Sequence, residues 1–144
     1  MTWLAYPIKE QIRITDMYSL FVVHYDCGYA FPGESHNFWE CVYIIKGEAC
    51  ISGNERVYNL AQGSIIFHKP LELHKFIVNG KDGADMLIFS FTAEGPLTAY
   101  LEEKVFMLSD FQKSIADSLL LFIGEHLKPT ADSEDLYRSG LEPF

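Results

Sequence analysis

The feature that most constrains this chain is a rhythm of short apolar runs separated by turn residues. Between residues 20 and 91, β-branched and aromatic runs are interrupted by Gly, Asn and Pro about every 6–10 residues, which is typical of a β-sandwich or barrel. The turn pairs Pro32-Gly33 and Lys46-Gly47 are expected to end strands. The strands predicted in this way cover residues 20–25, 39–45, 48–52, 55–60, 64–68, 73–78 and 86–91.

The pattern changes after Thr92 from strand to helix. Pro96 and the apolar spacing that follows it predict a short helix over 97–104. Ser109 with Gln112 three residues later is a capping-box pattern, which predicts a longer helix over 110–127. Residues 129–144 are polar and acidic and indicate no element. This order, strands first and helices last, predicts a barrel with helices packed outside it.

Charge and composition exclude several classes of function. The 144 residues suit one domain, and the net charge of −9 argues against direct binding to nucleic acid or to anionic membranes. No apolar run approaches the ~18 residues that a membrane span requires. The three cysteines have neither zinc-ribbon nor CxxC spacing, and an odd count without a signal peptide predicts a cytoplasmic protein.

One group of polar residues has a spacing that would bring its side chains together on one face of a strand. On a single straight strand, Glu34, His36 and Glu40 would face the same side, because side chains alternate with a period of two. His74, from a later strand, is expected to join them inside the barrel. Two imidazoles and two carboxylates suit a divalent transition metal, or they serve as hydrogen-bonding groups for a ligand without metal.

The same residues carry a family resemblance. Glu34-x-His36-x3-Glu40, then Gly47, Gly63 and His74, resembles the two motifs of the cupin superfamily. Glu34 replaces the usual first His, and the usual Pro-x-Gly turn is altered. The aromatic pair before Glu40, the spacing to Gly47 and the two terminal helices resemble more narrowly the sensor domain of AraC-type transcription regulators. The resemblance implies a mainly β, cupin-like double-stranded barrel (jelly roll) over 1–96, a helical dimerisation extension over 97–144, and no DNA-binding domain in this chain.

The resemblance also implies a function, that of a non-enzymatic sensor. A small-molecule effector would bind inside the barrel, and DNA would be contacted only through a separate domain. Sugars are common effectors in that family, although no residue here selects one. No cofactor is expected. The alternative is a small metal-dependent cupin enzyme of the dioxygenase or isomerase type, which would use Glu34, His36, Glu40 and His74 as metal ligands. The residues predicted to bind the effector are Glu34, His36, Phe38, Glu40, His74 and Phe76.

The predicted long helix carries apolar residues around more than one face. One face would pack on the barrel and another on a second copy, which predicts a homodimer; the alternative is a helix buried within the monomer. The residues predicted for the dimer contact are Ile115, Leu119, Leu120, Phe122 and Ile123.

Two histidines lie outside the motif. His24 and His68 are on apolar strands and are expected to be packed or edge histidines rather than ligands.

Overall fold

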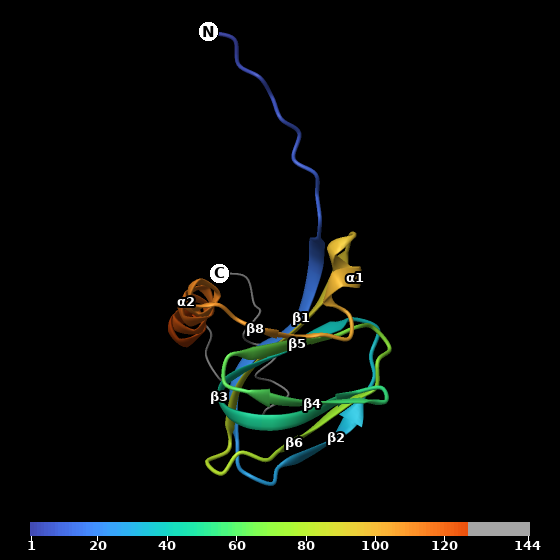
Figure 1. Cartoon of the computed structure of the whole chain (residues 1–144), viewed down its shortest axis with the longest axis vertical. Helices are drawn as coiled ribbons and strands as arrows, with labels where there is room; N and C mark the ends of the chain where they lie inside the picture. The colour runs from blue at the N-terminus through green and yellow to red at the C-terminus, as the bar shows by residue number, and fades with distance from the viewer. Residues whose placement is uncertain (127–144) are drawn as a thin grey trace.

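The computed structural model describes residues 1–126 of the chain (Figure 1). Residues 127–144, which include the last position of the predicted long helix and the polar acidic stretch, lie outside the described residues. An extended segment leads into the first strand. The elements are β1 (Arg13–Tyr25), β2 (Ala30–Glu34), β3 (Trp39–Gly53), β4 (Arg56–Ala61), β5 (Ser64–His68), β6 (His74–Val78), β7 (Ala84–Glu94), α1 (Leu97–Leu101), β8 (Val105–Met107) and α2 (Asp110–His126).

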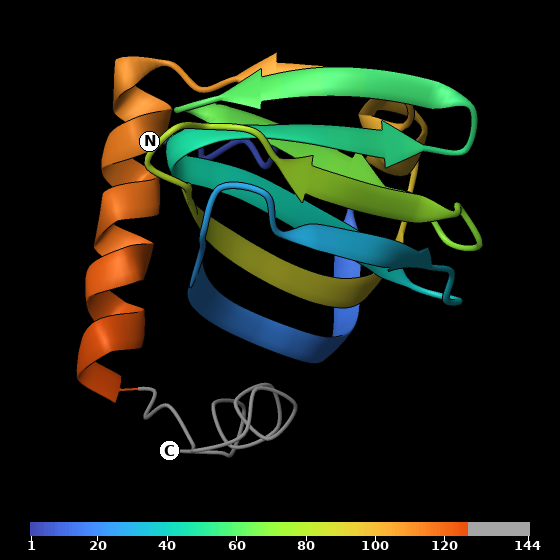
Figure 2. The same cartoon turned by 90° about the horizontal axis from the view of Figure 1, so that it is seen from below.

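The long strand β3 joins two antiparallel sheets. Its first half pairs with β5 and β7, and its second half pairs with β4 and β6. The first sheet has the order β1-β7-β3-β5-β8, and β2 joins the second sheet beside β6. The two sheets face each other across the interior (Figure 2). This arrangement is the cupin-type jelly roll predicted from the sequence.

The structure corrects several predicted boundaries. The segments 39–45 and 48–52 form one strand rather than two, because a register shift between Ile44 and Lys46 accommodates the bend within β3. Pro32-Gly33 lies inside β2, at another register shift, and does not end it. The helix predicted over 97–104 ends at Leu101, and after a short turn Val105–Met107 form β8, which pairs with β5.

The main core fills the space between the two sheets. Alternating residues of β3 and β7 point inward, and side chains from β4, β5 and β6 meet them. The buried members are Phe21, Val42, Ile44, Ala49, Ile51, Leu60, Ile66, Phe76, Val78, Ala84, Met86 and Ile88. This apolar packing supports the strands that carry the polar motif.

The helix α2 covers part of the outer face of the first sheet. It begins with the predicted capping box: the Ser109 hydroxyl accepts from the Gln112 amide at 3.2 Å, and the Gln112 side chain accepts from the Ser109 amide at 2.8 Å. Its buried residue, Ile123, packs on Tyr43 and Leu87. Within residues 1–126, neither helix combines the length and apolar character needed to cross a bilayer.

Candidate functional site

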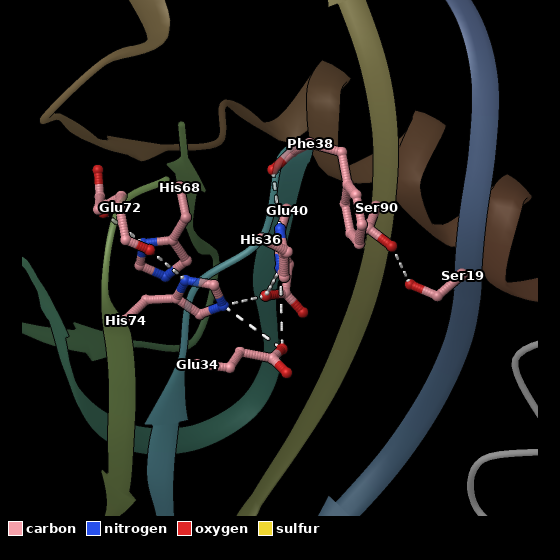
Figure 3. Close-up of polar contacts among 9 residues, drawn as sticks. All are labelled: Ser19, Glu34, His36, Phe38, Glu40, His68, Glu72, His74 and Ser90. Carbon is pink, nitrogen blue, oxygen red and sulfur yellow. Dashed lines mark hydrogen bonds and ion pairs between the residues drawn. The ribbon is translucent and has the colours of Figure 1, made fainter. Parts of the chain in front are cut away.

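The four motif residues come together, but not in the way that their spacing suggested. Glu34 is the last residue of β2, His36 lies in the connection 35–38, Glu40 is near the start of β3, and His74 opens β6. The premise that the first three share one straight strand is therefore wrong. Their side chains nevertheless converge, because β2 and β6 pair with Glu34 opposite His74 and the connection turns His36 inward (Figure 3).

The cluster is compact and reachable from one side. One ligand-type atom from each residue can be chosen so that all four lie within 4.8 Å of one another. Nε2 of His36 lies 3.4 Å from Glu40 Oε2 and 3.8 Å from Glu34 Oε1, and Nε2 of His74 lies 2.5 Å from Glu40 Oε2. The Glu34 side chain is 49% exposed and that of His74 only 5%. The site thus opens to solvent beside Glu34 and is closed behind His74.

Backbone carbonyls orient both imidazoles. Nδ1 of His36 donates to the Phe38 carbonyl at 2.9 Å, and Nδ1 of His74 donates to the Glu72 carbonyl at 3.0 Å. Since a carbonyl only accepts, each Nδ1 carries the hydrogen, and each Nε2 is directed toward the carboxylates. This carbonyl-to-imidazole arrangement is the one that orients metal-binding histidines in proteins.

Glu40 and His74 form a partly enclosed ion pair. Burial alone would raise the pKa of the Glu40 carboxyl, but the adjacent imidazoles of His36 and His74 outweigh it and lower the pKa from 4.5 to about 2. Burial would lower the pKa of His74, but the carboxylates of Glu34 and Glu40 outweigh it and raise the pKa from 6.5 to about 10. At neutral pH this pair is therefore carboxylate and imidazolium.

Aromatic rings border the cluster on one side. Phe38 stacks on His36 with ring centroids 3.9 Å apart, and Tyr18 in turn stacks on Phe38 with centroids 4.1 Å apart. Phe38 therefore lies beside the polar group, and its part in effector binding stays a prediction. Phe76 lies deeper, buried in the core and in ring contact with Phe31 and Tyr25. Phe76 is therefore a core residue outside the four-residue cluster, and its predicted role in effector binding stays a prediction.

The residues present fit a divalent transition metal. Nε2 of His74 is buried, and among the described residues it has no hydrogen bond of good geometry, although Glu40 lies close to it. Three of the four nitrogen–oxygen separations in the cluster are 3.4–3.8 Å, which is long for hydrogen bonds but ordinary between ligands that share one ion. The fourth, 2.5 Å between His74 Nε2 and Glu40 Oε2, would have to widen before both atoms could bind the same ion. His74 would have to lose its proton before ligating a cation, so affinity would rise with pH.

Two polar pairs beside the cluster were missed from the sequence. His68 was predicted to be a packed histidine, and it is buried, but its ring stacks on His74 and its Nδ1 contacts the buried Glu72 carboxylate. The Ser19 and Ser90 hydroxyls are hydrogen-bonded to each other on the opposite side (Figure 3). Alternation along β5, which puts His68 on the face of Ile66, was a signal for the first pair.

The fold and the cluster together define a class: a cupin-type barrel with a histidine–carboxylate site that opens to solvent. Residues 20–104, more than half of the chain, match the family described as "AraC-like ligand binding domain", and the chain belongs to this family. No curated protein matches the chain.

Several solved structures are similar at low sequence identity. The cupin domain of Schizosaccharomyces pombe Cnp3 is 15% identical, with a TM-score of 0.49, and the match covers 58% of this chain and 62% of that domain, less than two thirds of its length. The protein TT1209 from Thermus thermophilus is 18% identical, with a TM-score of 0.49, over 62% of this chain and 90% of that one. A cupin 2 conserved barrel domain protein from Rhodopseudomonas palustris is 20% identical, with a TM-score of 0.46, and the match covers 67% of this chain and 61% of that one.

Proposed function

We propose that this chain is the effector-sensing and dimerisation domain of an AraC-type transcription regulator inside the cell. The observation that carries the proposal is the convergence of Glu34, His36, Glu40 and His74 at a point that solvent reaches beside Glu34, in a chain of the AraC-like ligand binding family. Effector binding there would shift the population between two arrangements of the domain, and an attached DNA-binding domain would respond.

The charges of the site narrow the effector class. The Glu40 carboxylate and the His74 imidazolium offset each other, and the acidic side chain of Glu34 stands at the open side of the cluster, which disfavours carboxylate or phosphate ligands. The carboxylates accept hydrogen bonds, and Phe38 with Tyr18 offers a flat apolar border. We expect a small neutral or cationic molecule rich in hydrogen-bond donors, such as a sugar, a polyol or an amine.

Thermal unfolding against a panel of neutral sugars, polyols, primary amines and sugar acids tests this proposal. A neutral or cationic compound should stabilise the protein by about 2.7 kcal/mol at one hundred times its dissociation constant. The His36→Ala variant should lose that stabilisation. His24→Ala, which removes an exposed histidine paired with Asp85 away from the cluster, should keep it. If no compound stabilises the protein, or if His36→Ala responds like the wild type, the sensor proposal is abandoned.

A metal-dependent cupin enzyme is the second candidate, favoured by the buried and unaligned Nε2 of His74. Glu34, His36, Glu40 and His74 would hold the ion, which would supply a Lewis acid. Elemental analysis of protein purified without chelator separates the two candidates. Near-stoichiometric Fe, Mn, Ni or Zn that is lost in His36→Ala supports the enzyme. Absence of metal, together with stabilisation by a small molecule, supports the sensor.

Only some of the residues predicted for the dimer contact are exposed on α2. Ile123 is buried, and Leu119 and Leu120 are partly buried against the same cluster, so these three stabilise the monomer. Ile115 and Phe122 remain exposed, at spacings that place them on one side of the helix. The homodimer contact that we propose is therefore this side of α2, with Phe111 extending it by one turn.

Substitution of an exposed residue on that side tests the dimer. Ile115→Glu should convert a dimer to a monomer, because it places a charge in an apolar contact. Leu121→Glu is the matched control, since Leu121 is also exposed on α2 but faces another direction. Light scattering coupled to size-exclusion chromatography gives the mass of each variant. A wild-type chain that is monomeric at micromolar concentration would end the dimer proposal.

A further inference from the structure

A second polar pair lies enclosed directly behind the site. His68 and Glu72 side chains are 1% and 5% exposed, and His68 Nδ1 lies 2.7 Å from Glu72 Oε1. Neither residue belongs to the four-residue cluster. Burying such a pair is costly unless its geometry is good, and an apolar pair would have filled the same space. Its position therefore calls for a role beyond filling the core.

Glu72 holds both histidines at once. Its carboxylate contacts His68, and its backbone carbonyl accepts the hydrogen bond from Nδ1 of His74. The His68 ring also lies parallel to the His74 ring, with centroids 4.5 Å apart and an angle of 11° between the planes. Rotation of the His74 ring would break the hydrogen bond to the carbonyl and the stacking together. The direction of Nε2 therefore depends on where Glu72 sits.

The same loop reaches His36. The Leu71 amide donates to the His36 carbonyl at 2.8 Å, and the Glu72 amide donates to the Lys69 carbonyl at 3.2 Å. Leu71 has a φ of 67°, a left-handed conformation that a leucine adopts only when its surroundings impose it. The turn from Lys69 to Glu72 is thus tied to the backbone of one site histidine and to the side chain of the other.

The absence of a side chain at residue 53 makes room for the pair. Gly53 ends β3 opposite His74, and a Cβ there would overlap the Glu72 carboxylate. An alanine at this position would displace Glu72 without removing any polar group. Gly53 therefore gives a second way to move the pair.

We propose that His68 and Glu72 are a positioning pair, which holds the 69–72 turn so that Nε2 of His74 points at Glu40 and the His36 backbone stays in place. This inference rests on the proposed binding role of the four-residue cluster. It assigns a role to two residues that lie outside that cluster. A pair that only stabilised the core would leave the His74 ring unchanged when replaced by apolar groups.

The test follows the Nδ1–H proton of His74 by NMR, in protein without any ligand or metal. In the wild type this proton should be visible and slow to exchange, because it is buried and bonded to the Glu72 carbonyl. Glu72→Gln, which keeps a hydrogen bond to His68, should retain the signal. Glu72→Leu should lose it while the backbone amide spectrum stays that of a folded protein.

Two further variants keep the proposal falsifiable where Glu72→Leu does not fold. The double substitution His68→Phe with Glu72→Leu keeps a stacked ring and leaves no buried charge unpaired, and Gly53→Ala displaces the carboxylate only. Both should lose the His74 signal. A folded variant of either kind that retains the wild-type signal overturns the proposal, as does a wild type without it. Because no ligand is used, failure of the sensor proposal leaves this result unaffected.

Discussion

The Glu40→Ala variant is expected to lose about 3–5 kcal/mol of unfolding free energy, because it removes one partner of an enclosed ion pair. His74 would keep its charge beside a void or would lose its proton, and either outcome costs stability. Urea denaturation of the wild type and of Glu40→Ala at pH 6 measures the difference in unfolding free energy. Glu40→Gln, which keeps the shape and one acceptor oxygen, should lose less. Equal loss in the two variants would show that packing, rather than charge, dominates at this position.

The pH dependence of stability gives an independent check on the same pair. The pKa of Glu40 is lowered to about 2, so its stabilising contribution is present above pH 4.5 and is lost as the pH falls toward 2. The pKa of His74 is raised to about 10, so its contribution is present below pH 6.5 and is lost as the pH rises toward 10. Wild-type stability should fall on both sides of this window, and Glu40→Gln should flatten both slopes. A profile of the variant that overlays the wild type refutes the ion-pair assignment.

Gly47→Ala is expected to destabilise the fold by about 2–5 kcal/mol, the sum of a backbone and a packing penalty. Gly47 has a φ of 89° in the middle of β3, where residues with a side chain are strained. A Cβ would also overlap the Gly83 carbonyl oxygen and approach Ala84 Cα to 2.9 Å. Both obstacles are backbone atoms of the neighbouring strand and its loop, so they cannot rotate away. The midpoint of urea unfolding measures the loss.

Gly28→Ala is the matched control for this substitution. Gly28 has a similar φ of 92°, but a Cβ there would meet no atom within 4 Å. Its replacement should therefore cost only the backbone term, about 1–2 kcal/mol. The difference between the two variants isolates the cost of the close approach at Gly47. If Gly28→Ala and Gly47→Ala lose the same stability, the crowding around Gly47 has no energetic consequence.

Local patterns in the sequence were sufficient for much of the architecture. The turn rhythm predicted the β class, and Ser109 with Gln112 predicted the start of α2, because turn and cap preferences depend on a few neighbouring residues. The same reasoning failed at Lys46-Gly47. A glycine in the left-handed conformation can either end a strand or let the strand bend and continue. At Gly47 the strand continues, which only its pairing with β7 shows.

The faces of α2 show a similar limit. Its apolar residues predicted a helix with more than one buried side, but periodicity cannot tell a face that meets the barrel from one that does not. The structure places Leu119, Leu120 and Ile123 against the sheet and leaves Ile115 and Phe122 exposed. The pairing of β8 with β5 and the cap at Ser109 place the start of α2 beside the sheet, and these contacts lie outside the helix itself.

The sequence by itself determined the residue types of the site and the barrel class that carries them. The tertiary structure alone decided that Glu34, His36 and Glu40 meet His74 from three separate segments, with His68 and Glu72 enclosed behind them. The physical reason is that residues 34 and 74 become neighbours through the pairing of β2 with β6. Such long-range register is set by burial of the whole sheet, and no local spacing records it.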